Sequence, residues 1–236
     1  MKPYSNQTGS LAKTLRMVGF TLAIGVSPLF GQSYVDTLAD LSDNGGTLSV
    51  GDKTFCGFSY FASSGLTSFD PTQINVEASI GSDGVYYLTW SGNISLATFA
   101  TASADLKLNY IVSASAGVIN TIDQAYTGSA QGGGLLAVDE TVSTGNFGGT
   151  IVGQSHLNAL DVSDPPPEMN DNLSIMPPDT LLYVTKDISL ASASPGGSLV
   201  TISQVAQSFH QIPEPSAEIL GSLAAGFLLL SKSRRK

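Results

Sequence analysis

One stretch of the sequence alternates strictly between apolar and polar side chains. Every second residue from Ile74 to Ile80 is apolar, and the residues between them are Asn75, Glu77 and Ser79. Because successive side chains of a β-strand point to opposite faces, this period of two predicts a strand with one buried face. Turn residues follow at 81–84, and 85–90 is rich in aromatic and β-branched residues. The sequence therefore predicts a β-hairpin over 74–90.

Similar short segments recur along the chain, and no long amphipathic helix separates them. Helical spacing is confined to Tyr34, Val35, Leu38 and Leu41, and the glycine-rich stretch 128–134 is expected to form a hairpin loop or bulge. The further predicted strands are 47–50, 54–61, 106–112, 118–122, 135–142, 149–152, 157–160, 181–188 and 199–205. This pattern predicts an all-β fold, namely an antiparallel β-sandwich. A jelly roll is the more specific topology that the same pattern allows.

The body of the chain, 32–211, is acidic. It contains three lysines, no arginine and seventeen Asp and Glu, which gives a formal charge of 3 − 17 = −14. Such a surface is repelled by nucleic acid and by anionic membranes, so neither is expected as a partner. A body of this length fits one domain and can bury a core without metals or disulfides.

Cysteine and histidine are too scarce to predict a nucleophilic site. Cys56 is the only cysteine, which excludes an intramolecular disulfide, and it is expected to be a small buried residue of a strand. His156 lies in a polar stretch, and His210 lies in an expected linker close to the C-terminal motif. Neither is predicted to pair with Cys56.

Two charged dipeptides lie inside predicted strands. Asp139 and Glu140 are adjacent, as are Lys186 and Asp187. Neighbouring residues of a strand point to opposite faces, which does not favour a glycosidase-type carboxylate pair within the first dipeptide. With no Gly-x-Ser-x-Gly elbow and no zinc-binding histidine motif in the sequence, no enzymatic activity is predicted.

A proline-rich acidic stretch at 161–172 is the only candidate metal site. Its carboxylates are Asp161, Asp164, Glu168 and Asp171, and hard oxygen ligands suit Ca²⁺. Their spacing does not match an EF-hand, so a solvated loop is the favoured interpretation and Ca²⁺ the alternative. No other cofactor is predicted.

Aromatic residues raise a carbohydrate-binding alternative. Tyr60, Tyr86, Tyr87 and Trp90 offer rings on which a sugar could stack. In a regular strand Tyr86 and Trp90 share one side while Tyr87 faces the other. Packing of this stripe into the core is the favoured interpretation.

The N-terminus has the organisation of a secretory signal peptide. Lys2, Lys13 and Arg16 precede an uncharged apolar run, 17–30, and small residues follow. We expect a signal helix over 1–31 and removal by signal peptidase after Gly31 or Ser33.

The C-terminal segment, 212–236, combines three features in order. Pro213 and Pro215 hold Glu214 in a stiff extended peptide, and an apolar segment follows at 219–230. This predicts a short transmembrane helix, since a full span needs about 20 apolar residues. The final basic residues, which would lie at the cytoplasmic face, are Lys232, Arg234, Arg235 and Lys236.

This segment resembles the PEP-CTERM sorting signal of Gram-negative bacteria. The resemblance implies recognition of Pro213, Glu214 and Pro215 by exosortase at the inner membrane, removal of the tail, and export to the cell surface or an exopolysaccharide matrix. The body is also similar to those of other secreted PEP-CTERM proteins. We therefore expect a three-part chain, with a signal peptide (1–31), a β-sandwich (32–211) and a sorting signal (212–236). The expected role is structural or adhesive in a biofilm, with a lectin-like module as the alternative and a secreted hydrolase as a third possibility.

Overall fold

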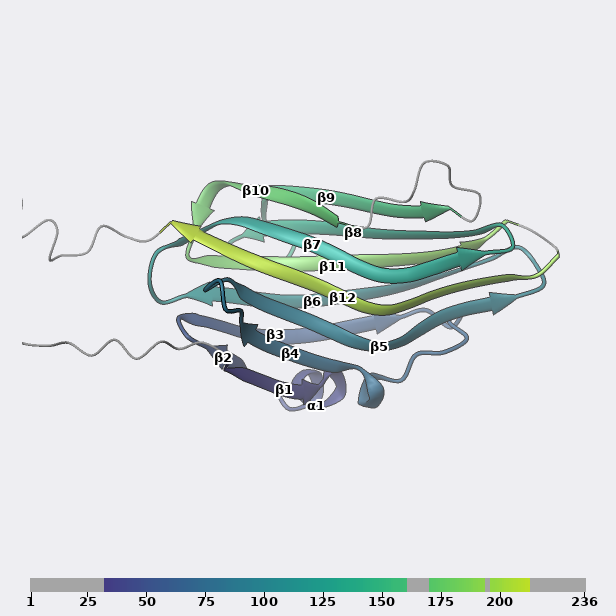
Figure 1. Ribbon diagram of the computed structural model, residues 1–236, viewed down its shortest axis with the longest axis horizontal. Coiled ribbons are helices and arrows are strands. Elements are labelled where there is room, and N and C mark those ends of the chain that lie inside the picture. Colours follow the sequence, from purple (N-terminus) through teal and green to yellow (C-terminus); the bar gives the residue numbers. More distant parts are fainter. Residues whose placement is uncertain (1–31, 161–169, 194–195, 213–236) are drawn as a thin grey trace, which may run out of the picture.

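The computed structural model describes residues 32–160, 170–193 and 196–212, which fold into two antiparallel sheets of six strands each (Figure 1). Sheet A contains, in spatial order, β1 (Ser33–Thr37), β4 (Asn75–Ile80), β5 (Tyr86–Thr98), β12 (Ser198–Ile212), β7 (Val118–Gln131) and β10 (Asn170–Asp179). Sheet B contains β2 (Leu48–Val50), β3 (Lys53–Ala62), β6 (Ala102–Ala114), β11 (Leu181–Ser192), β8 (Gly134–Thr144) and β9 (Thr150–Leu160). The predicted all-β antiparallel sandwich is confirmed.

The eight strands from β5 to β12 follow jelly-roll pairing. β5 pairs with β12, β6 with β11, β7 with β10, and β8 with β9. Because this pairing alternates between the sheets, each sheet receives four of these strands. The earlier strands extend the roll at one edge, β1 and β4 in sheet A and β2 and β3 in sheet B.

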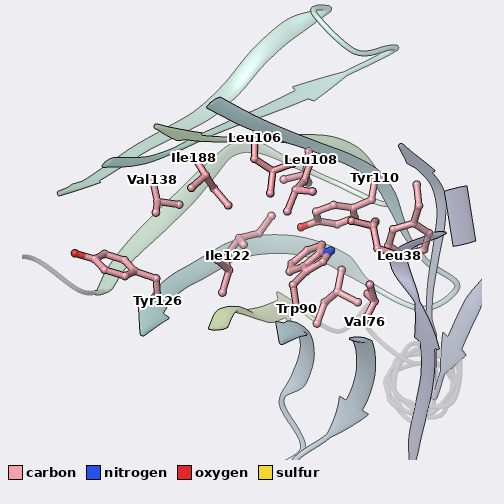
Figure 2. Packing of buried hydrophobic residues seen from close by; sticks show 14 of the residues in the cluster. Leu38, Val76, Trp90, Leu106, Leu108, Tyr110, Ile122, Tyr126, Val138 and Ile188 are labelled. Atoms are coloured by element: carbon pink, nitrogen blue, oxygen red, sulfur yellow. The ribbon is translucent and has the colours of Figure 1, made fainter. Parts of the chain in front are cut away.

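The core lies between the two sheets and is built from the alternating apolar positions of both. Trp90 of β5 and Tyr110 of β6 come from opposite sheets, and their ring centroids lie 5.3 Å apart. Figure 2 shows these two rings packed beside Val76 and Leu108. Phe55 and Phe209 extend the aromatic contact with ring centroids 5.2 Å apart. Side chains of this size supply most of the free energy of burial in such a core.

Helix is limited to α1 (Leu38–Asp43) and the single 3-10 turn η1 (Pro71–Gln73) among the described residues. The Thr37 hydroxyl caps α1 by accepting a hydrogen bond from the Asp40 N–H at 3.1 Å. Within the described part of the chain, no helix has both the length and the apolar character needed to cross a bilayer. The predicted signal helix and C-terminal transmembrane helix fall in 1–31 and 213–236, outside the described residues.

Several predicted elements differ from those observed. Residues 33–37 form an edge strand instead of the start of a helix, because their backbone pairs with β4. The segments 149–152 and 157–160 belong to one continuous strand, β9. His210 lies in β12 and not in a linker, and β10 was not predicted at all.

Cys56 is half-buried instead of buried. Gly57, with a φ of +62°, introduces a bulge at which the register of β3 against β6 shifts. The bulge turns both Phe55 and Phe58 into the core and leaves Cys56 on the outer side.

The two ends of the described chain lie at the same end of the sandwich (Figure 1). Ser33 pairs with Ser79, Ser79 with Tyr87, and Tyr87 with Ser208, four residues before Ile212 ends β12. The turn between β7 and β8 lies at the opposite end, since Gln131 pairs with Leu199 at the start of β12.

Candidate functional site

A polar hollow of about 540 Å³ lies on the outer face of sheet B. We call it the outer groove. Four neighbouring strands, β6, β11, β8 and β9, contribute to it. The residues that line it are Lys107, Asp139, Glu140, Thr141, Gln154, Ser155, His156, Thr185 and Asp187.

Strand register brings these residues together from distant parts of the sequence. Asp187 of β11 pairs with Lys107 on one side and with Asp139 on the other, and Asp139 pairs with His156. In the adjacent row Thr185 pairs with Thr141. Because alternate residues face the same side, both rows project outward while the residues between them point into the core.

The groove holds two carboxylates on directly opposed positions. Like charges in such a cross-strand pair repel each other. Each carboxylate has a basic neighbour, with His156 Nδ1 at 2.5 Å from Asp139 Oδ1 and Lys107 Nζ at 3.7 Å from Asp187 Oδ2. All four side chains are substantially exposed, so these pairs position the groups more than they stabilise the fold.

Hydroxyl and amide groups continue the polar row toward β3. The Thr185 hydroxyl donates to Asn109 Oδ1 at 2.9 Å, and Asn109 Nδ2 donates to Ser59 Oγ at 3.2 Å. These bonds fix the side-chain orientations across three strands. A molecule in the groove would therefore meet ordered donors and acceptors instead of freely rotating side chains.

Exposed aromatic rings lie beside the outer groove. Phe61, 68% exposed, pairs across the strands with Lys107. Phe147, in the β8–β9 turn, packs edge-on against Tyr183, with ring centroids 5.2 Å apart. Tyr183 precedes Thr185 by two residues on β11 and so shares its outward side.

A buried polar cluster lies in the core beneath the groove. Lys186 of β11 and Glu140 of β8 are the inward neighbours of Asp187 and Asp139, and both are almost fully buried. Lys186 Nζ lies 2.5 Å from Glu140 Oε2 and donates to Gln124 Oε1, also at 2.5 Å. The Gln207 amide donates to Glu140 Oε2.

Burial shifts both members of this ion pair toward neutrality. Desolvation lowers the pKa of Lys186, against the opposing attraction of Glu140. Desolvation likewise raises the pKa of Glu140, and the nearby ammonium of Lys186 opposes the shift. Tyr110 joins the cluster by donating its hydroxyl proton to Gln207, and burial raises its pKa well above the ordinary value of 10.0.

A serine, a histidine and an aspartate also meet on the outer face of sheet A, but not as a catalytic triad. His210 Nε2 lies 2.8 Å from Asp123 Oδ2 and 3.4 Å from Ser208 Oγ. A triad needs the acid and the serine on different ring nitrogens. Here Ser208 itself donates to Asp123 at 2.9 Å, so the hydroxyl proton is directed at the carboxylate.

The four aromatic residues considered from the sequence form no common platform. Trp90 is only 2% exposed and belongs to the core, which confirms the favoured interpretation. Tyr86 lies beneath the Lys53 ammonium, 4.3 Å from its ring centroid, and Tyr60 packs against Phe69. Tyr87 faces the other way and donates to Asp83 at 3.0 Å.

The candidate calcium and sorting residues are mostly outside the described chain. Asp161, Asp164 and Glu168 lie in 161–169, and the Pro213-Glu214-Pro215 motif and the basic tail, Lys232 to Lys236, lie in 213–236. Asp171 belongs to β10, where its carboxylate accepts the Asn172 N–H at 2.7 Å. No group of three potential metal ligands occurs among the residues that the structure describes.

The outer groove is not predicted from the sequence, because each charged dipeptide by itself shows only that its two side chains point to opposite faces. Adjacent residues do point to opposite faces, as predicted, but Asp139-Glu140 and Lys186-Asp187 lie in register on neighbouring strands. The outward members meet in the groove and the inward members meet in the core. The available signal was a charged dipeptide inside each of two otherwise apolar, alternating strands.

No family model and no curated protein matches this sequence. Among solved structures, the chain is similar to TmCBM61 in complex with β-1,4-galactotriose, with 12% identity, coverage of 67% of this chain and 89% of that chain, and a TM-score of 0.29. It is also similar to a family 11 carbohydrate-binding module from Clostridium thermocellum bound to a mixed-linked tetrasaccharide, with 11% identity, coverage of 66% and 91%, and a TM-score of 0.19. A third similarity is to the arabinose-bound α-L-arabinofuranosidase MgGH51, with 8% identity, coverage of 63% and 23%, and a TM-score of 0.22. All three scores lie below 0.5, so these likenesses assign the chain to none of these families.

Proposed function

We propose that the protein is an exported polysaccharide-binding module and that the outer groove is its binding site. The observation that carries this proposal is the alignment of ordered polar side chains across four strands, with Asp139, Asp187, Thr185 and His156 opening onto one hollow. Sugar hydroxyls both donate and accept hydrogen bonds, and carboxylate, amide and hydroxyl side chains complement them. The apolar faces of Phe61 and Tyr183 would contact the C–H faces of sugar rings.

Charge favours a neutral polysaccharide over an acidic one. Of the three lysines in 32–211, Lys53 and Lys186 are buried, which leaves Lys107 as the exposed one against many surface carboxylates. A ligand carrying uronate, sulfate or phosphate groups would be repelled by this surface. A neutral chain would incur no such penalty and could lie across the strands.

Affinity electrophoresis on a panel of neutral and acidic polysaccharides tests the proposal. We expect retardation by at least one neutral polymer. The variant Asp187→Ala should weaken it at least about tenfold, since hydrogen bonds to charged groups contribute about 1.5–3 kcal/mol and tenfold is about 1.4 kcal/mol. Glu77→Ala, on the outer face of sheet A, is the matched control and should bind like the wild type. Equal loss in both variants, or no retardation by any neutral polymer, would refute the assignment.

The same samples separate binding from hydrolysis. The two opposed carboxylates invite this comparison, because paired carboxylates perform glycoside hydrolysis. We expect the bound polymer to keep its chain length. Release of reducing ends that is abolished by Asp139→Asn would instead identify a secreted hydrolase.

The route to the cell surface is proposed from the sequence alone. The signal peptide, the Pro213-Glu214-Pro215 motif and the basic tail support export, transient residence in the inner membrane and processing by exosortase. The module would then hold exopolysaccharide at the surface or in the matrix, in a structural or adhesive role. Mass spectrometry of surface-extracted protein should show that the chain ends near Pro215, and an intact terminus at Lys236 would contradict the processing.

A further inference from the structure

We propose that the buried cluster makes a covalent cross-link, an amide bond between Lys186 Nζ and Gln124 Cδ, with Glu140 carrying the proton. The cross-link would join β11 of sheet B to β7 of sheet A through the middle of the core. This chemistry concerns the interior of the sandwich and is independent of ligand binding in the outer groove.

The reacting groups are already in contact. Lys186 Nζ lies 2.5 Å from Gln124 Oε1. Because a C=O bond is about 1.2 Å long, Nζ lies no more than about 3.7 Å from the carboxamide carbon, close to the separation of reacting atoms in a near-attack arrangement. Gln124 is assigned over Gln207 because its carbonyl oxygen is the one that accepts from Nζ, whereas Gln207 donates its amide to Glu140.

Hydrogen bonds hold the Gln124 carboxamide in place. Its Nε2 donates to Ser155 Oγ at 2.9 Å and to the Val138 carbonyl at 3.2 Å. These partners fix the plane of the amide and turn its oxygen toward Lys186. The exposed fraction of Gln124 is 1%, so the carboxamide is also shielded from bulk water.

Glu140 is placed to move the proton that the reaction requires. Its Oε2 contacts Nζ, and its Oε1 is buried with no hydrogen-bond partner in the part of the chain that the structure describes. Burial favours the neutral forms of both groups, because it lowers the pKa of Lys186 and raises that of Glu140. Transfer of a proton from the ammonium to the carboxylate yields a nucleophilic amine beside a carboxylic acid and removes two charges from the core.

The step balances without any further reactant. Glu140, which holds the proton taken from the ammonium, gives it to Nε2 of Gln124 as the lone pair of Nζ attacks Cδ and a C–N bond forms. The attacking nitrogen then loses a proton to the Glu140 carboxylate, the bond from Cδ to Nε2 breaks, and one ammonia leaves. The product is a secondary amide, and Glu140 is again the carboxylic acid that it was when the attack began. Water is neither consumed nor released.

Proteolytic mapping of the full-length protein tests the cross-link. Trypsin cleaves after Lys and Arg, and Lys107, Lys186 and Lys232 are successive sites. In denatured protein we expect cleavage after Lys107 but not after Lys186, and a peptide 108–232 lighter by one ammonia. In a separate digest of the intact chain, cleavage at glutamate yields 78–140 and 169–218 as two peptides if the chain is unlinked, since Pro215 blocks cleavage after Glu214, whereas in the linked chain these two peptides remain one species.

A pair of glutamine variants supplies the matched control. Gln124 and Gln207 are both 1% exposed and both lie on inner positions of sheet A. Gln124→Met should abolish the mass loss and restore cleavage after Lys186, while Gln207→Met should keep the link. Glu140→Gln retains the shape of the proton carrier without its acidity and should leave the chain unlinked. Lys53→Arg, at the other buried lysine, should leave the link intact.

The masses of the wild-type tryptic peptides test the cross-link even if a variant fails to fold. Unmodified peptides 108–186 and 187–232 from correctly folded protein would overturn the proposal and leave Lys186 as an ion-paired core residue. Loss of one water instead of one ammonia would make Glu140 the acyl donor and would overturn the assignment to Gln124. A cross-link that persists in Gln124→Met would also overturn the assignment to Gln124.

Discussion

Lys53 and Lys186 are fully buried, and each ammonium group lies between a carboxylate and a glutamine carboxamide. Lys53 contacts Asp52 at 2.8 Å and the side chain of Gln211, and it lies over the Tyr86 ring. Removing one partner of a buried ion pair leaves the other charge without compensation, which typically costs about 3–5 kcal/mol. Each buried lysine therefore depends on its carboxylate partner, and neither adds to the surface charge of the sandwich.

Trp90 is the residue whose truncation should harm the fold most directly. It is buried in the centre of the core against Tyr110. Trp90→Ala should lower the free energy of unfolding by about 3–5 kcal/mol, because it removes the indole and leaves a cavity. Urea denaturation measures this loss. Phe61→Ala, at a ring that is 68% exposed, serves as the control and should change stability by no more than about 0.5 kcal/mol; comparable losses in both would contradict the placement of Trp90.

Tyr110 should make the fold sensitive to alkali. Burial raises its pKa in the folded state above the ordinary value of 10.0, whereas the unfolded side chain ionises near that value. The neutral phenol thus contributes stability that is complete below about pH 10 and is lost as the pH rises toward the folded-state pKa. The free energy of unfolding should fall between pH 9 and pH 11 by a smaller amount in Tyr110→Phe than in the wild type. An identical fall in the variant would show that other groups account for it.

At the scale of elements, the turn from β7 to β8 is constrained by close backbone packing. Gly132 has a φ of +64°, and a Cβ added there would lie 2.0 Å from the Gly197 carbonyl oxygen. Gly145, in the β8–β9 turn, has a φ of +83° but open space around it. Gly145→Ala should cost only the left-handed strain, about 1–2 kcal/mol, and Gly132→Ala should cost clearly more because backbone must move. Thermal unfolding of the two variants compares them, and equal shifts would contradict the close approach.

The local sequence pattern is sufficient to predict strands that have one face in the core and the other in solvent. The hairpin at 74–90 and the strands around 106–112, 135–142 and 181–188 each alternate between core and solvent, so their side-chain period identifies them. The segment 170–179 contains two consecutive prolines and four polar residues near its start, and it was missed. It is a strand because β7 provides an edge to pair with, which is a tertiary effect.

The outer groove and the buried cluster depend on register, which no single segment encodes. Glu140 and Lys186 are separated by 46 residues, and Gln124 and Lys186 by 62. Within its own strand, none of these three residues indicates which residue it faces. Only the jelly-roll pairing shows that they face one another, and the sequence pattern predicts the number and character of strands more readily than their partners.

For the whole molecule, the proposed cross-link would close a loop of 62 residues. On the chain-entropy model used for disulfides, a loop of that length contributes about 4 kcal/mol. Because the unfolded wild type would be more compact than an open chain, it should migrate faster than Glu140→Gln on a denaturing gel. Equal migration of the two unfolded chains would argue against a closed loop.

Binding of a neutral polymer should be nearly independent of salt. The exposed surface carries a large excess of carboxylates, but a neutral ligand releases no counterions when it binds. Retardation in affinity electrophoresis should therefore change little between low and high salt. A steep loss of binding with added salt would indicate ion pairing through Lys107 and an acidic ligand.

The position of β12 bears on how the module would respond to a pulling force. The strand lies inside sheet A, hydrogen-bonded to β5 on one side and to β7 on the other, and it ends at Ile212. If the chain is tethered through the segment after Ile212, tension acts along β12 and loads both ladders in shear at once, so that many hydrogen bonds must break together instead of one at a time. A sandwich tethered through a central strand would therefore need a higher force to unfold than one tethered through an edge strand.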